Sequence, residues 1–150
     1  MNIKEAREFL KNLVNESSQR REIKIYNKFI GVLTGIENRE FSIHQIEMIE
    51  KELTILNLKQ PTKNRKKYIR KKLSEFVQYL ESEYSIILEG HYADLGLKIG
   101  LVFGVALGIA IFRDSGGSST GMCFGMFIGY FIGKYMDKEA VKQNQVLKIA

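Results

Sequence analysis

The chain has 150 residues, of which 45% are hydrophobic and 27% are charged, and its formal net charge is +6. This length suffices for one ordinary domain, or for one small domain with a membrane anchor. A single cysteine excludes an internal disulfide framework and the usual cysteine-based zinc sites. The first residues lack the apolar core of a secretory signal, so internal segments would have to carry the chain to a membrane.

The composition divides the chain into two unlike parts. Eleven of the thirteen glycines fall between Gly90 and Gly133, whereas most of the charged residues come before Asp94. The change is abrupt and marks a boundary near residues 90–95. We therefore predict a soluble helical domain over 1–90, an apolar hairpin over 91–136 and a short cytoplasmic helical tail over 137–150.

Four helices are predicted in the N-terminal domain, because apolar residues recur there at helical spacing. They cover about 2–15, 20–34, 43–57 and 64–89. Gly35 is placed to end the second helix, and Pro61 separates the third from the fourth. Short links between amphipathic helices predict an all-α fold that begins with a small bundle. Its core is modest, so its stability is expected to depend partly on a membrane, a partner or self-association.

The third helix has the clearest start signal in the chain. Ser42 and Gln45 have the spacing of a capping box, and Phe41 with Ile46 matches a hydrophobic staple. The stripe predicted for the buried face of this helix contains Ile43, Ile46, Ile49, Leu53 and Leu56. The corresponding face of the fourth helix contains Ile69, Leu73, Phe76, Leu80, Tyr84 and Ile87.

Two apolar segments, 95–112 and 121–136, follow the domain and are separated by a polar, glycine-rich turn. Each has one charged residue, Lys98 near the start of the first and Lys134 near the end of the second. A helix over the first segment extends about 27 Å, which is close to the hydrocarbon thickness of about 30 Å. The segments are therefore predicted to form a two-helix transmembrane hairpin whose lysines extend to the same interface.

Glycines recur at every fourth position in both segments. The first ladder contains Gly96, Gly100, Gly104 and Gly108, and the second contains Gly121, Gly125, Gly129 and Gly133. A four-residue step advances about 400° around a helix, so each ladder forms a nearly straight groove where two backbones can approach closely. Two matched ladders predict helix packing through GxxxG contacts in a membrane. A buried hairpin in a soluble protein is the alternative, but the rest of the chain has few residues to cover it.

The charges that flank the hairpin predict its orientation. Lysines lie near the outer ends of the two segments, whereas the connecting turn contains one arginine, Arg113, and one aspartate, Asp114. Short cytoplasmic segments carry an excess of lysine and arginine in membrane proteins. Both termini are therefore expected in the cytoplasm, with the turn on the other side.

These motifs resemble those of a group of small bacterial membrane proteins. The hairpin is similar to their glycine-zipper two-helix segments. The stretch from Phe41 through Leu58, RKKYIRKKL, the two ladders and MDKEA resemble uncharacterised proteins of this layout. The resemblance covers about two thirds of the chain. It implies this architecture and a bacterial source, but no activity and no site residue. Together with the predicted hairpin, a bacterial source predicts a location in the bacterial cytoplasmic (inner) membrane.

A basic run over 63–72, KNRKKYIRKK, contains seven cations and no acid. The candidates for lipid or partner contact are Lys63, Arg65, Lys66, Lys67, Arg70, Lys71 and Lys72. Four interpretations stay open: a solvated helix start that meets the acidic face at Glu47–Glu52, anionic lipid, a protein partner, or nucleic acid. Nucleic acid is disfavoured because the run has one aromatic residue and no recognised binding fold. Lipid contact requires a flat or bent fourth helix, because Lys72 is about 35 Å of helix away from Leu95.

The sequence contains no recognisable set of catalytic, cofactor-binding or metal-ligating residues, so it predicts no enzyme and no cofactor. The first hypothesis is a structural membrane protein whose hairpin packs or forms a homo-oligomer through its glycines, while the cytoplasmic helices scaffold or recruit a partner. The second is a pore-forming or membrane-perturbing effector, holin-like or toxin-like. Short spans and a polar turn fit the second hypothesis, but neither segment has the polar stripe that a water-filled pore needs.

Overall fold

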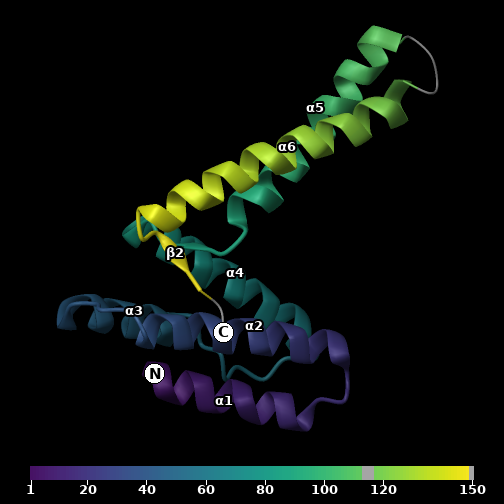
Figure 1. Ribbon diagram of the computed structural model, residues 1–150. Helices are drawn as coiled ribbons and strands as arrows, with labels where there is room; N and C mark the ends of the chain where they lie inside the picture. The colour runs from purple at the N-terminus through teal and green to yellow at the C-terminus, as the bar shows by residue number, and fades with distance from the viewer. Residues whose placement is uncertain (113–116, 149–150) are drawn as a thin grey trace. The chain divides into compact units, whose positions relative to one another are not determined.

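The computed structural model describes residues 1–112 and 117–148, which form six helices and two strands of two residues each (Figure 1). The prediction of an all-α fold is confirmed. Arg113 and Asp114, on which the predicted orientation partly depends, lie outside the described residues, as do the last two residues of the predicted tail. The chain divides into two units. One contains residues 1–88 and the C-terminal residues from Leu147 onward, and the other contains residues 89–146.

The first unit is built from four helices. They are α1 (Ile3–Glu16), α2 (Arg20–Glu37), α3 (Ile43–Ile55) and α4 (Arg65–Tyr84). α2 lies against both α1 and α4, and α1 also contacts α3. The predicted capping box of α3 is confirmed. Ser42 Oγ accepts a hydrogen bond from the Gln45 N–H at 3.3 Å, and the Ser42 N–H donates to Gln45 Oε1 at 2.9 Å.

The core of this unit is apolar. Its largest fully buried side chains include Tyr26, Phe29 and Phe76, and the centroids of the Phe29 and Phe76 rings lie 5.7 Å apart. Among the described residues, no charged or strongly polar side chain is buried. Leu147, near the C-terminal end, is 2% exposed and belongs to the same core. The segment that follows the hairpin therefore completes the N-terminal domain.

α2 continues past Gly35, so the prediction that this glycine ends the helix is wrong. The helix ends instead at Glu37. A Cβ at Gly35 would lie 2.8 Å from Cγ of Leu147 and 3.0 Å from the carbonyl oxygen of Lys148. Gly35 therefore makes room for the C-terminal segment, which is too distant in the sequence for local spacing to reveal the contact.

Part of the buried stripe predicted for α3 is also wrong. Ile49, Leu53 and Leu56 are buried as predicted, but Ile43 is 80% exposed and Ile46 is 37% exposed. Ile43 is the first residue of the helix. The bundle covers the later turns of α3 and leaves its first turn in contact with solvent.

α4 is shorter than predicted because the chain leaves the helix at Ser85. This residue is in the left-handed conformation, with a φ of 52°, and its N–H donates to the Glu81 carbonyl at 3.0 Å. Strand β1 (Ile87–Leu88) follows and pairs with β2 (Val146–Leu147). Ile87 is buried as predicted, but in a strand rather than in a helix.

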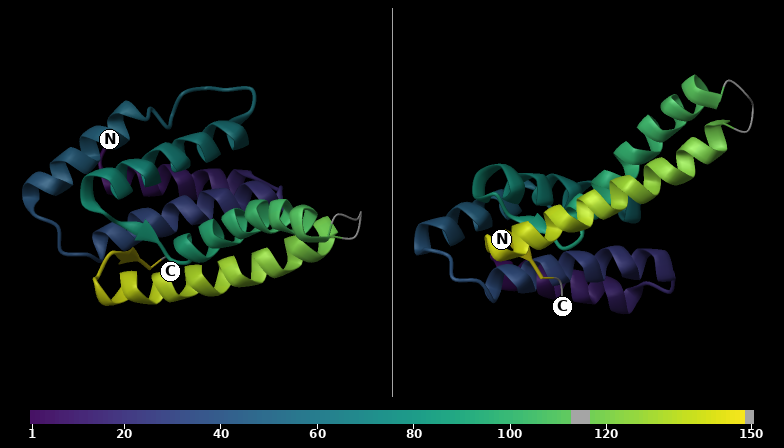
Figure 2. Two further views of the ribbon diagram at one scale, coloured as in Figure 1. Left: turned by 90° about the horizontal axis from the view of Figure 1, so that it is seen from above. Right: turned by 45° about the horizontal axis from the view of Figure 1, so that its top comes forward.

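The second unit is a hairpin of two helices, α5 (His91–Phe112) and α6 (Gly117–Lys142), which lie side by side along their lengths (Figure 2). The predicted segments 95–112 and 121–136 fall within them, and both helices begin earlier than predicted. The tail predicted as helical over 137–150 is helical only as far as Lys142, because Asn144, with a φ of 55°, turns the chain into β2.

Candidate helix-packing site

The two glycine ladders face each other within the hairpin. The opposed pairs are Gly96 with Gly129, Gly100 with Gly125 and Gly104 with Gly121. Gly108 lies against Gly117, which stands four residues before the second ladder, and Gly133 lies against Tyr92 and Ala93. A Cβ added at Gly121 would lie 2.6 Å from the Gly108 Cα, whereas carbon atoms in contact are separated by about 3.5–4.0 Å. The interface is therefore filled by backbone and admits no side chain.

This close approach places backbone oxygens along glycine Cα–H bonds. A Cβ added at Gly100 would collide with the carbonyl oxygen of Gly125, and a Cβ added at Gly125 would collide with the carbonyl oxygen of Gly100. In glycine a hydrogen occupies that direction. The reciprocal geometry is that of paired Cα–H···O contacts, each worth about 0.5–1 kcal/mol in condensed phase.

Asp137 of α6 bonds to the first turn of α5. It stands four residues after Gly133, in line with the second ladder. Its carboxylate accepts hydrogen bonds from the N–H groups of Tyr92, at 2.9 Å, and Ala93, at 3.0 Å. The first N–H groups of a helix have no partner within that helix, and a carboxylate also complements the positive end of the helix dipole. Asp137 therefore caps α5 from the other helix. The sequence did not predict this role, and its one signal there is the position of Asp137 in line with the second ladder.

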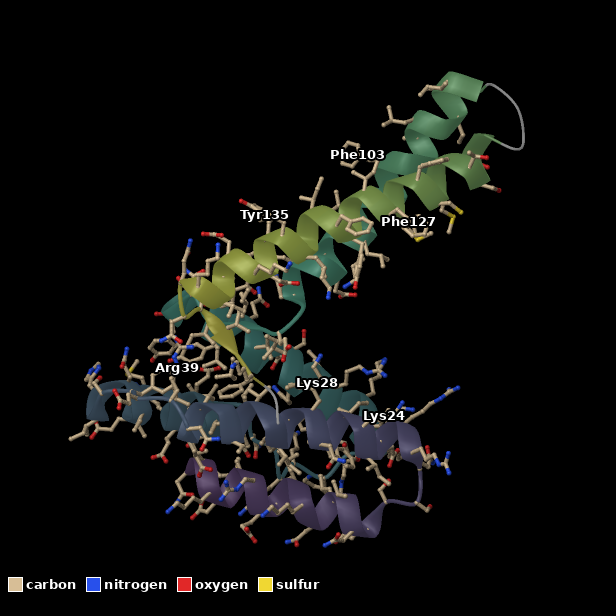
Figure 3. The ribbon with its side chains drawn as sticks, viewed as in Figure 1. Lys24, Lys28, Arg39, Phe103, Phe127 and Tyr135 are labelled. Atoms are coloured by element: carbon tan, nitrogen blue, oxygen red, sulfur yellow. The ribbon has the colours of Figure 1, made fainter. Side chains whose placement is uncertain are left out.

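Small residues lie inside the hairpin and large apolar residues lie outside. The buried residues are Ala93, Gly104, Gly108, Gly117, Gly133 and Ala140. Phe103 is 65% exposed, Phe127 is 66% exposed and Tyr135 is 70% exposed, and these side chains project from the helices (Figure 3). A helix of a water-soluble domain buries its apolar face. The hairpin has the reverse arrangement.

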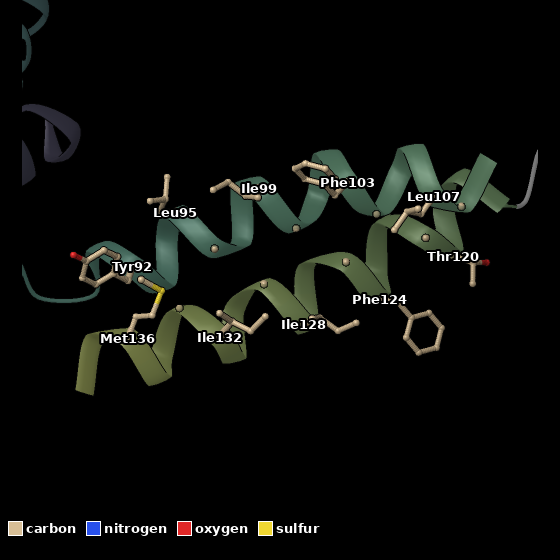
Figure 4. Close-up of a pocket in the computed structure, with 18 of the residues that line it drawn as sticks. Tyr92, Leu95, Ile99, Phe103, Leu107, Thr120, Phe124, Ile128, Ile132 and Met136 are labelled. Atoms are coloured by element: carbon tan, nitrogen blue, oxygen red, sulfur yellow. The ribbon is translucent and has the colours of Figure 1, made fainter. Parts of the chain in front are cut away.

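One flank of the hairpin forms an apolar groove of about 650 Å³. Its floor is the glycine interface, and its walls are two further four-residue ladders (Figure 4). These are Leu95, Ile99, Phe103, Leu107 and Ile111 on α5, and Thr120, Phe124, Ile128, Ile132 and Met136 on α6. Tyr92 and Thr120 lie toward its two ends, and the described residues that line it include no charged side chain.

Two lysines lie toward the end of the hairpin that contains the start of α5. Lys98 Nζ lies 2.5 Å from Oδ2 of Asp94, one turn nearer that end. Lys134 Nζ lies 5.8 Å from the centroid of the Tyr130 ring, within the range of a cation–π contact. The side chain of Lys98 therefore extends toward the start of α5, as predicted for two lysines that reach one bilayer surface.

The basic run begins α4 and is spread over the surface of the first unit. Arg65 lies 3.7 Å from Glu16 of α1, and Lys72 lies 2.9 Å from Glu75. The hydrogen bond from Lys72 lowers the pKa of Glu75. The other cations, which are exposed or half-buried, are Lys63, Lys66, Lys67, Arg70 and Lys71. The ion pairs of the run are with α1 and within α4, and none joins it to Glu47–Glu52 in the described part of the chain. The pKa of Lys72 is raised by its hydrogen bond to Glu75 and, to a smaller extent, by the charge of Glu52.

Among the described residues, no group of three or more His, Cys, Asp or Glu side chains could hold a metal ion. One described helix, His91–Ile111, is long and apolar enough to cross a membrane, with a mean hydropathy of 1.9. Two spans were predicted, but α6 falls short on composition because it contains serines, tyrosines and Lys134. Comparisons with protein-family models, curated proteins and solved structures find no match to the chain.

Proposed function

We propose that the protein is a non-enzymatic integral membrane protein whose glycine hairpin is embedded in the bilayer and whose N-terminal helices form a cytoplasmic scaffold. The observation that supports this proposal is the arrangement of the hairpin, which has small residues inside and large apolar residues outside. Burying apolar surface is worth about 25 cal/mol per Å² in water, and side chains such as Phe103 and Phe127 forgo that gain when they remain exposed. In a bilayer these side chains would contact hydrocarbon, so their exposure would not forgo this free energy.

The packing supports embedding both helices, although only α5 is strongly apolar throughout. The glycine pairs leave no space between the helices for a lipid chain. α6 exposes Phe124, Phe127 and Phe131 along the same length. Its lysines, Lys134, Lys138 and Lys142, lie toward one end of the hairpin, and Lys134 is at the level of the start of α5, where a bilayer surface would be. Lipid that surrounds α5 would therefore also surround α6.

The scaffold role has two separate supports. Because the glycines are occupied within one hairpin, self-association would use the walls of the apolar groove instead. On α3, Ile43 and Ile55 are 80% and 65% exposed, which offers apolar contacts to a protein partner. We favour this role over a pore-forming or membrane-perturbing one, because the described groove residues provide no charged path along the hairpin.

The lysines also support an orientation. Lys98, Lys134, Lys138 and Lys142 would lie at one bilayer surface, and the positive-inside rule assigns that surface to the cytoplasm. Both termini would then be cytoplasmic, in the inner membrane of a bacterial cell.

Extraction at alkaline pH tests the proposal. The full chain, expressed in bacteria, should stay in the membrane pellet after a carbonate wash and dissolve only in detergent. A double variant with Val102→Lys and Phe127→Lys, which places charge on both outward faces, should be released. Ile55→Lys is the matched control, because it removes an equally exposed apolar side chain from the other unit and should leave the pellet unchanged. Release of the unaltered chain by the wash would contradict the proposal.

A further inference from the structure

We propose that the hairpin binds one phospholipid with a phosphoethanolamine headgroup, in a cavity near the start of α5. This inference rests on the proposed membrane location. The cavity has a volume of about 490 Å³ and is formed within the second unit. Its lining residues Leu97, Tyr130 and Lys134 each follow a ladder glycine, whereas the apolar groove is walled by residues that precede the glycines. The cavity therefore lies on the other flank of the helices.

The charges in this cavity favour a phosphate. Lys134 and Lys138 stand one helical turn apart, both are exposed, and neither forms an ion pair with a carboxylate in the described residues. Two neighbouring carboxylates are already engaged, because Asp137 accepts two amide N–H groups and Asp94 pairs with Lys98. The two ammonium groups can therefore donate charge-assisted hydrogen bonds to a bound phosphate.

The carboxylate of Glu89, which also lines the cavity, selects the rest of the headgroup. Glu89 is exposed, lines the same cavity, and forms no ion pair in the described part of the chain. A primary ammonium can donate hydrogen bonds to this carboxylate, whereas a quaternary ammonium has no N–H to donate. A headgroup with one phosphate and one primary ammonium matches the lysine pair and Glu89 together.

The apolar part of the cavity suits the adjoining acyl carbons. Leu97 is half-buried, Tyr130 is 38% exposed and Val141 is 50% exposed, and all three line the cavity beside the lysines. A polar headgroup site that continues into an apolar wall distinguishes a lipid from a free phosphate compound.

Native mass spectrometry of the full chain in mild detergent tests this site. Phosphatidylethanolamine, phosphatidylcholine and phosphatidylglycerol with the same acyl chains serve as probes. The ethanolamine lipid should bind about tenfold more tightly than the choline lipid, since only its ammonium donates hydrogen bonds to Glu89. Lys134→Gln with Lys138→Gln should weaken all three lipids by about tenfold or more, and Glu89→Gln should remove the preference for ethanolamine. Lys142→Gln is the matched control, because Lys142 pairs with Glu139, and it should change nothing.

A soluble competitor and the order of lipid affinities separate the alternatives. Soluble glycerophosphoethanolamine should not compete at the same concentration, and equal competition would overturn the assignment to a lipid. Equal binding of the three lipids, unaffected by the lysine variants, would overturn the site, and a preference for phosphatidylglycerol that survives Glu89→Gln would overturn the headgroup. If the chain resists alkaline extraction but shows no lipid preference, only this inference fails. If it is washed from membranes, the proposed function fails.

Discussion

Replacing Gly100 by alanine tests whether the glycine interface holds the hairpin together. A Cβ at this position would lie 2.8 Å from the carbonyl carbon of Gly125 and 3.1 Å from the Cα of Gly129, and still nearer to the Gly125 carbonyl oxygen. All three are backbone atoms, which cannot rotate away as a side chain can. The helices must therefore separate to accommodate one methyl group.

The expected loss follows from the contacts that this separation weakens. A reciprocal pair of Cα–H···O contacts is worth about 1–2 kcal/mol. Separation at Gly100 weakens its own pair of contacts and the adjacent pairs at Gly96 and Gly104. Losing all three pairs would cost about 3–6 kcal/mol. Alanine regains about 1 kcal/mol of intrinsic helix propensity. We therefore expect a net loss of about 2–5 kcal/mol in hairpin packing, and a larger loss for Gly100→Leu.

Spin labels on the outer faces of the two helices can measure the separation. Cys123 is exposed on α6, and Val102, which is 65% exposed on α5, can be replaced by cysteine. Both lie between the levels of the Gly100 and Gly104 pairs. In detergent or lipid, Gly100→Ala should lengthen and broaden the distance distribution, and Gly100→Leu should do so more strongly.

A matched substitution separates the position of added bulk from its size. Ala106 is exposed on α5, and Ala106→Leu adds volume away from α6. This variant should leave the label distance unchanged. If both Gly100 variants keep the original distance, or if Ala106→Leu lengthens it as much as Gly100→Leu does, then the glycine contacts do not set the separation of the helices.

Three further substitutions test contacts outside the ladders. Asp137→Asn should cost about 1–2 kcal/mol and speed hydrogen exchange of the Tyr92 amide; unchanged exchange would contradict the cap. Leu147→Ala should destabilise the N-terminal domain by about 2–5 kcal/mol in urea unfolding, and an unchanged midpoint would remove this residue from the core. Glu75→Gln should lower the free energy of unfolding at pH 7 by about 0.3–0.5 kcal/mol, because the pair with Lys72 is partly exposed. The hydrogen bond from Lys72 lowers the pKa of Glu75 from its ordinary value of 4.5. The contribution of the pair to stability is therefore present above pH 4.5 and is lost as the pH falls through the lower pKa of the folded state. The free energies of unfolding of variant and parent should converge in acid, and a difference that persists there would contradict the pairing.

Features with local causes could be predicted from the sequence. The capping box at Ser42 depends on residues three positions apart, and it forms as predicted. The buried face of α4 follows helical spacing as far as Leu80. Gly35 and the end of α4 could not be predicted in this way, because both are coupled to Leu147 and its strand at the other end of the chain. Helical spacing contains no information about such a distant neighbour.

The candidate site was predicted in its composition but not in its pairing. Four-residue spacing shows that a helix offers a smooth face, and it does not show which helix covers that face. The structure pairs the two ladders with each other, from Gly96 with Gly129 to Gly104 with Gly121. Only with that pairing known does Asp137 come to lie opposite the first amides of α5. The cap is thus a consequence of the register, which the single helices do not specify.

The glycine content and the outward apolar residues of the hairpin both favour hydrocarbon over water as its surroundings. In water each ladder glycine costs a helix about 1 kcal/mol relative to alanine. In hydrocarbon an unpaired backbone group costs several kcal/mol, so the solvent itself enforces the helix and the glycine penalty becomes small by comparison. Glycine can then be used where α5 and α6 need direct backbone contact. In a bilayer, as proposed, side chains such as Phe103 and Phe124 would not have to drive the pairing, because hydrocarbon would solvate them wherever they point.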